Sequence, residues 1–193
     1  MGFRAELKNL KVQDKRKAKE KSDKKWITTI LIITFTVSIC MSFISEMTIP
    51  KANIFIGIII TLIFIFIGVI FDIIGVSVTA ADEKIFHSMN SRKVKGAKIA
   101  VKFKKNADKV SNFCCDVIGD VCGVVSGTAA ASISLILSSN LNTNVFVTTL
   151  IVTGIIASLT IGGKAIGKSY AINKSDVILF EFSKIVSCFY KEK

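Results

Sequence analysis

The sequence has very few of the residues that build histidine or cysteine metal sites. His87 is the only histidine, and the five cysteines include no C-x-x-C pair and no nearby histidine at a metal-binding spacing. We therefore interpret the cysteines as small apolar residues. No serine or cysteine stands at a spacing from His87 that suggests a nucleophile with its base, so the sequence does not predict an enzyme.

Tryptophan and tyrosine are also scarce, with one Trp and two Tyr, although the chain is strongly basic. It holds 26 Lys and Arg against 14 Asp and Glu, which gives a net charge of +12. Nucleic-acid-binding proteins place base-stacking aromatic residues between their basic residues, and the basic segments here hold almost none. Nucleic-acid binding is therefore not expected.

Charged residues are absent from long segments, and the mean hydropathy of +0.57 is high for a soluble domain of this size. Uncharged runs cover residues 26–45 and 52–71, and a third run of 43 residues extends from Val121 to Gly163. Because about 20 apolar residues cross a bilayer core, the third run is long enough for two spans. The polar stretch "SSNLNTN", residues 138–144, is typical of a turn between them. The sequence thus predicts an all-α membrane protein with four transmembrane helices.

The first run, residues 26–45, is the retained first span on this interpretation. Its apolar part is too long for a signal peptide, and no A-x-A-like cleavage site follows it. The link to the next run contains Pro50, the only proline, where a turn between two helices is expected. We expect the membrane domain to cover residues 26–170.

Three basic segments flank the spans. Residues 1–25 hold ten Lys or Arg against four acids and predict a solvated arm. Residues 82–112 hold nine Lys or Arg against three acids, with apolar residues at helical spacing. This pattern is typical of amphipathic helices on a surface of anionic lipid headgroups. Those apolar residues are Ile85, Phe86, Met89, Val94, Ala97 and Val101. Residues 171–193 predict an interfacial amphipathic helix that begins at a cap signal, Ser175 and Asp176. Its expected apolar face is Ile178, Phe182, Ile185 and Phe189.

The distribution of charge predicts the orientation. Nearly all positive residues lie in residues 1–25, 82–112 and 164–193, whereas the two other links hold only Glu46 and Lys51. Cytoplasmic segments carry the excess of Lys and Arg. We therefore expect a multi-pass protein of the cell membrane with both termini in the cytoplasm.

The stretch "GGKAIGKS", residues 162–169, matches the phosphate-binding pattern G-x-x-x-x-G-K-[ST]. A phosphate loop follows a strand of a parallel sheet and needs further strands that supply a magnesium-binding acid. Here an uncharged run of spanning length precedes Gly162, and only 24 residues follow Ser169. No nucleotide is expected. The glycines are interpreted instead as positions where the end of a membrane helix packs closely or unwinds.

Three short motifs follow one another along the spans: "GVSVTA" (residues 75–80), "IGD" (residues 118–120) and "GKAIGKS" (residues 163–169). In this order they resemble the transmembrane module of the CorB/CorC and cyclin-M (CNNM) magnesium transporters. "GVSVTA" keeps Ser77, Thr79 and Ala80 of the stretch that closes the family's first span. "IGD" places Gly119 and Asp120 at the positions of a Gly-Asn pair near the inner end of the family's next span. "GKAIGKS" keeps Gly163 and Lys168 of the family's Gly-Glu-x-x-Pro-Lys, with Lys164 at the glutamate position and Gly167 at the proline. The resemblance covers residues 53–190 and leaves the first span as an addition.

The resemblance implies a homodimer with a polar pocket that binds Mg²⁺ at the family's serine, asparagine and glutamate positions. On this chain the expected metal-site residues are Ser77, Thr79, Gly119 and Asp120, with Asp116 one helical turn before Asp120. A lysine at the glutamate position departs from the family, because a divalent cation requires oxygen ligands and negative charge. The family's cytosolic nucleotide-sensing domains have no counterpart here.

Four ionisable residues at the ends of spans allow three interpretations: Asp72, Asp116, Asp120 and Lys164. On the first interpretation, each residue contacts headgroups or water. On the second interpretation, Asp120 and Lys164 form an ion pair, so that an ammonium group replaces the metal. On the third, the three aspartates coordinate a cation together with Ser77 and Thr79, while Lys164 reaches the interface.

Two functional hypotheses follow from these interpretations. The first is a membrane protein of the CorB and cyclin-M type, reduced to its membrane module, that transports Mg²⁺. The second is a non-transporting membrane scaffold or regulatory subunit that binds a protein partner and has lost the ion from its pocket.

Overall fold

The computed structural model describes residues 25–47 and 54–189, which are helical apart from short links. The predicted basic arm, except for Lys25, and the link at Pro50 lie outside the described residues. The first helix, Lys25–Met47, is long and apolar enough to cross a membrane. The chain divides into two units between Thr36 and Val37, inside this helix.

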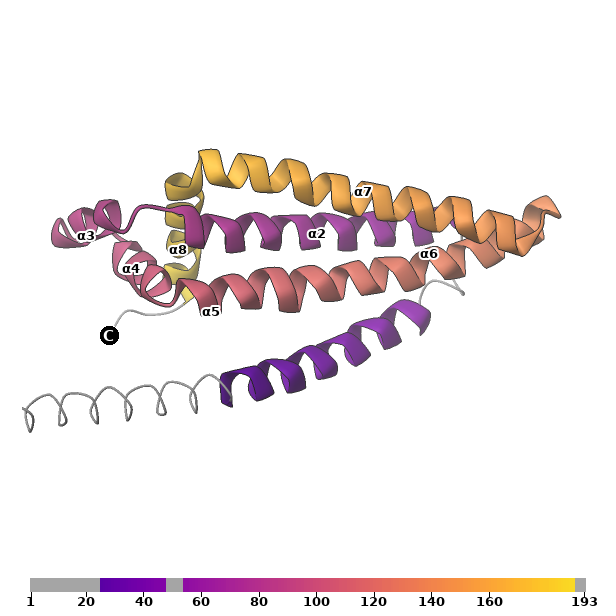
Figure 1. The fold of residues 1–193 in the computed structure, drawn as a ribbon, viewed down its shortest axis with the longest axis horizontal. Helices are drawn as coiled ribbons and strands as arrows, with labels where there is room; N and C mark the ends of the chain where they lie inside the picture. Colours follow the sequence, from indigo (N-terminus) through magenta and orange to yellow (C-terminus); the bar gives the residue numbers. More distant parts are fainter. Residues whose placement is uncertain (1–24, 48–53, 190–193) are drawn as a thin grey trace, which may run out of the picture. The chain divides into compact units, whose positions relative to one another are not determined.

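Three further helical segments of spanning length lie side by side in the second unit (Figure 1). They are α2 (Ile54–Ala80), a continuous segment from Ala107 to Leu141, and α7 (Val145–Asn173). The middle segment consists of α5 (Ala107–Asn112), a π-helical stretch η1 (Phe113–Gly119) and α6 (Asp120–Leu141). The prediction of an all-α membrane protein with four transmembrane helices is confirmed.

The turn between α6 and α7 lies where the polar stretch predicted it. Asn142 adopts the left-handed conformation (φ 49°), which asparagine tolerates better than most residues and which ends α6. The Asn144 side chain accepts a hydrogen bond of 2.9 Å from the backbone N–H of Phe146 and so caps α7. The chain therefore reverses direction between α6 and α7 through a short turn, and residues of the turn itself end one helix and begin the next.

Small residues of α6 form the centre of the bundle. Ser126, Ala129, Ala130 and Ser134 are buried, and Ser134 Oγ lies 2.9 Å from Thr149 Oγ1 of α7. Small side chains let helix backbones approach closely in lipid, where packing rather than water exclusion holds helices together. The large apolar side chains of α2 and α7, such as Phe66 and Ile155, are exposed on the protein surface. This inverted distribution is the one expected of a protein that faces lipid.

A second core lies at the polar end of the bundle, where α3 (Glu83–Ser91), α4 (Ala97–Lys105) and α8 (Ser175–Phe189) meet α2 (Figure 1). Its buried residues are Val78, Ala81, Phe86, Ala100, Val101 and Leu179. The Asp82 side chain accepts a hydrogen bond from the backbone N–H of Lys84 and caps α3. The predicted amphipathic helices are thus present, and most of their apolar face packs inside the protein.

Helix α8 begins at Ser175, as its cap signal predicted, and it buries a row of small residues against the protein. Its buried residues are Ser175, Leu179, Ser183 and Ser187, whereas Ile185 is 57% exposed. Phe182 is half-buried and stacks on Phe103 of α4, with ring centroids 5.7 Å apart. The small serine face fits because α8 packs closely against α2 and α4 rather than lying alone on an apolar surface.

Candidate ion site

Charged residues of three spans meet where the bundle joins the second core. Asp72 comes from α2, Asp120 begins α6, and Lys164 and Lys168 are four residues apart on α7. Residues at i and i+4 share a helix face, so both lysines are directed toward the neighbouring helices. We call these four residues the charge cluster.

The predicted ion pair between Lys164 and Asp120 is present. Lys164 Nζ lies 3.1 Å from Asp120 Oδ1, and it donates a hydrogen bond to that oxygen. The lysine side chain is 19% exposed and the aspartate 68% exposed. The pair joins α6 to α7 and neutralises both charges.

A second pair joins Lys168 of α7 to Asp72 of α2, with Nζ 3.5 Å from Oδ2. Asp72 is 2% exposed, whereas Lys168 is 52% exposed. Asp72 Oδ2 is buried and accepts no hydrogen bond from the described residues, although it lies within ion-pair distance of the lysine. Asp72 therefore does not contact water or headgroups, in contrast to the first interpretation of the ionisable residues.

Gly119 lies between the two ion pairs, and because it has no side chain the two pairs can approach each other. A Cβ atom at this position would lie 3.2 Å from Asp72 Oδ1 and 3.6 Å from Lys164 Nζ. Gly119 ends the π-helical stretch, and such stretches occur mostly as local insertions, frequently at functional sites. Cys115 of the same stretch packs so tightly on Gly75 of α2 that a side chain at Gly75 would collide with its sulfur. Both glycines allow η1 to approach α2.

The other predicted metal-site residues do not converge on this point. The Ser77 hydroxyl is buried and donates a 2.7 Å hydrogen bond to the carbonyl of Ile73 in its own helix. Thr79 is exposed and donates similarly to Val76. Asp116 is exposed, and the described residues contain no group of three or more His, Cys, Asp or Glu that could hold a metal ion. Of the predicted metal-site residues, Asp120 belongs to the charge cluster and Gly119 lies next to it.

The stretch "GGKAIGKS" is a continuous part of α7. A Cβ at Gly163 would lie 3.1 Å from Val69, and one at Gly167 would lie 2.8 Å from Ile73, both on α2, so these glycines allow close helix packing. The helix does not unwind here, and both lysines of the stretch pair with aspartates. The geometry thus has neither the loop nor the free lysine of a phosphate-binding motif.

The roles of Asp72 and Lys168 as partners were not predicted. The sequence did contain a signal for this second pair. Lys164 and Lys168 are four residues apart on one helix face, and Asp72 and Asp120 lie near the ends of neighbouring spans. Lys104 is a further residue that the sequence did not single out. Its Nζ donates hydrogen bonds to the carbonyls of Thr79 (2.7 Å) and Val78 (3.2 Å) and so caps the end of α2.

Comparison with known proteins adds no family assignment, since no protein-family model, curated protein or solved structure matches the chain.

Proposed function

We propose that this multi-pass membrane protein does not conduct divalent cations and that it is a scaffold or regulatory subunit of the membrane. The observation that carries the proposal is the pairing of each aspartate in the charge cluster with a lysine, at 3.1 Å and 3.5 Å. Two carboxylates and two ammonium groups sum to zero charge. A divalent cation would have to displace both lysines before it found the negative charge that it requires.

The proposal retains the membrane module that the CorB and cyclin-M resemblance implies, with its cation replaced by ammonium groups of the chain itself. The cluster then holds α2, α6 and α7 together, because ion pairs in a largely apolar environment are costly to break. We further propose a homodimer in the cell membrane with both termini in the cytoplasm, as the resemblance and the charge distribution imply. Terminal reporter fusions test the orientation, and cross-linking in membranes tests the dimer.

Mg²⁺ transport is the second candidate, and one observation favours it. Asp72 Oδ2 is a buried carboxylate oxygen to which no described residue donates a hydrogen bond, and its lysine partner is half exposed. Buried polar atoms without donors are rare and suggest a missing ligand. If Lys168 moves toward solvent, Asp72 and Asp120 become available as oxygen ligands.

Magnesium flux into liposomes that contain the purified protein, measured with an internal dye, distinguishes the two functions. We expect no flux above that of protein-free liposomes, and an ionophore added at the end verifies the dye. Flux that Asp120→Ala abolishes while the protein remains monodisperse would overturn the proposal and establish transport. Lys164→Ala is the matched variant, because it exposes the same carboxylate without removing it.

A further inference from the structure

An open apolar groove lies between α2 and α7, among side chains that the bundle exposes to lipid. Its volume is about 520 Å³, and every residue that lines it is apolar. The lining includes Ile59, Leu62, Ile63, Phe66, Leu159 and Gly163. Gly163 leaves the hollow on the α7 side, since a Cβ atom there would already lie 3.1 Å from Val69. The groove therefore fits a hydrocarbon chain and has no polar side chain to hold a polar ligand.

The α7 side of the groove continues on the same helix face to a tyrosine and a lysine. Gly163, Tyr170 and Lys174 are spaced seven and four residues apart, which places them on one face of α7. Tyr170 is 52% exposed, and Lys174 Nζ lies 5.7 Å from the centroid of its ring. A cation–π contact of this kind holds the ammonium group beside the ring. The face thus combines an apolar groove with a phenol and a positive charge two to three turns further along.

The acid that follows Lys174 in the sequence does not neutralise this charge. Asp176 Oδ1 accepts a 2.8 Å hydrogen bond from the backbone N–H of Asp82. Lys174 is exposed and forms no ion pair with any residue that the structure describes. Its ammonium group is therefore available to an anion that approaches from solvent or from the membrane surface.

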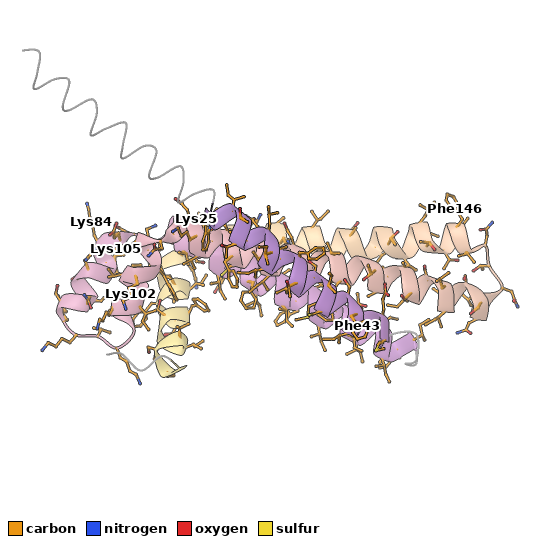
Figure 2. All side chains as sticks on the ribbon, turned by 90° about the horizontal axis from the view of Figure 1, so that it is seen from below. Lys25, Phe43, Lys84, Lys102, Lys105 and Phe146 are labelled. Carbon is orange, nitrogen blue, oxygen red and sulfur yellow. The ribbon has the colours of Figure 1, made fainter. Side chains whose placement is uncertain are left out.

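The end of α7 that carries Lys174 lies at the level of the lipid headgroups. The 29 residues of α7 span roughly 43 Å at 1.5 Å per residue, which exceeds the ~30 Å of the hydrocarbon core. Figure 2 shows Lys84, Lys102 and Lys105 at one end of the bundle, and Phe146, near the start of α7, at the other. Lys174 ends α7 and so belongs to the end with the lysines. Basic side chains collect outside the hydrocarbon core, so this end contacts headgroups.

The distance between the groove and Lys174 matches the depth of one leaflet. Lys174 follows Gly163 by 11 residues, or about 16 Å along the helix. Half of the ~30 Å hydrocarbon core is about 15 Å, which is the depth that the acyl chains of one leaflet cover. A phospholipid whose phosphate lies beside Lys174 therefore has the terminal part of an acyl chain at the groove.

We propose that the groove and the Tyr170–Lys174 pair together bind one phospholipid with an anionic headgroup. The acyl chain occupies the groove, and the phosphate accepts hydrogen bonds from the Lys174 ammonium group and the Tyr170 hydroxyl. The ammonium group complements the headgroup by charge, and the tyrosine is the kind of residue that is enriched at this depth. The inference depends on α2 and α7 lying in the membrane and is independent of whether the protein conducts ions.

The test measures binding of phosphatidylglycerol and of phosphatidylcholine to the detergent-solubilised full-length protein by native mass spectrometry. We expect the wild type to prefer phosphatidylglycerol. Lys174→Gln should lower the affinity for phosphatidylglycerol about fivefold, the contribution of one lysine near a membrane surface, and should leave phosphatidylcholine nearly unchanged. Lys174→Arg should retain the preference. The groove variant Ile63→Ala, Phe66→Ala should weaken both lipids by the same factor, because both have acyl chains.

Each arm has a matched control. Lys102→Gln removes the same charge from an exposed lysine of α4, and Phe55→Ala, Ile56→Ala removes similar exposed side chains of α2 outside the groove. Unchanged melting in neutral detergent verifies that the variants fold, as expected for exposed positions.

Three outcomes would overturn the proposal. Equal losses in Lys174→Gln and Lys102→Gln would show that the preference follows net charge alone. Competition by inorganic phosphate at equal charge concentration would assign Lys174 to a soluble anion. A dimer in the wild type that the groove variant converts to a monomer would assign the groove to a second copy of the chain.

Discussion

Lys164 and Asp120 lie 44 residues apart in the sequence and 3.1 Å apart in the structure, and they join the last two spans of the bundle. The same helix face of α7 also brings Lys168 to Asp72. Both lysines come from the "GGKAIGKS" stretch, in which Gly163 and Gly167 reduce the separation between α7 and α2. Close packing and charge pairing therefore depend on the same eight residues.

The Lys164–Asp120 pair should show coupling in a double-mutant cycle. We expect Lys164→Ala to cost more stability in the wild type than in an Asp120→Ala background. The difference between the two costs is the coupling energy of the pair, and it should be about 1 kcal/mol. This value is above that of a fully solvated pair because Lys164 is only 19% exposed. Denaturant unfolding in detergent measures it, and additive effects of the two substitutions would show that the residues do not interact.

The Lys168–Asp72 pair should respond unequally to loss of its two members. Lys168→Ala leaves a buried carboxylate without its cation, whereas Asp72→Asn leaves an ammonium group that is half exposed and can be hydrated. We expect Lys168→Ala to destabilise the protein by about 1–3 kcal/mol, the cost of an unsatisfied buried polar group, and Asp72→Asn by less. Melting temperatures of the two variants test this, and a larger loss for Asp72→Asn would mean that Lys168 does not compensate Asp72.

Gly119→Ala should disturb the charge cluster, and Gly123→Ala provides its control. The added methyl group at Gly119 would meet Asp72 Oδ1 at 3.2 Å and the Cys114 carbonyl at 3.4 Å, whereas at Gly123 it would meet no atom of the described residues within 4 Å beyond its own helix backbone. We expect a loss of about 1–3 kcal/mol for Gly119→Ala, as for other overpacked positions. Gly123→Ala should cost nothing, since alanine favours the helix. Equal melting temperatures would show that Gly119 does not limit the approach of η1 to α2.

Much of this fold follows from local signals in the sequence. The uncharged runs predict the four spans because a bilayer requires about 20 apolar residues for each. Asn144 and Ser175 mark the starts of α7 and α8, since capping depends on residues within one helical turn. The Asp120–Lys164 pair was predicted from an exchange of charge at two positions of the resembling family.

Other features depend on packing between distant segments and have no local signal. The burial of Asp72 is set by η1, whose π-helical turns place Gly119 against α2. Similarly, α8 buries its serines because α2 and α4 approach it closely, whereas helical periodicity indicated only where its apolar face lies. Hydrophobic patterning identifies a face that avoids water, but it does not distinguish contact with lipid from contact with protein.

The role of the "GGKAIGKS" glycines can be separated within one helix. A methyl group at Gly167 would lie 2.8 Å from Ile73 Cγ1, while at Gly162 it would meet no atom within 4 Å from another part of the described structure. We expect Gly167→Ala to destabilise the protein by about 1–3 kcal/mol and Gly162→Ala to leave it unchanged or slightly more stable. Ile73→Ala removes both Cγ1 and Cδ1 of Ile73, so it should cost less stability in a Gly167→Ala background than in the wild type. Thermal unfolding of the single and double variants measures this, and equal costs in the two backgrounds would point to a different origin of the strain.

The second core should contribute to the stability of the whole membrane unit. Phe86 is fully buried there and packs with residues of α2, α4 and α8, whereas its neighbour Ile85 is 41% exposed. We expect Phe86→Ala to cost about 3–5 kcal/mol, the range for large buried side chains, and Ile85→Ala to cost far less. Hydrogen exchange of the α2 and α8 amides measures whether the loss spreads. Faster exchange confined to α3 would mean that this helix does not share a core with α2 and α8, because a shared core would be destabilised throughout by the cavity.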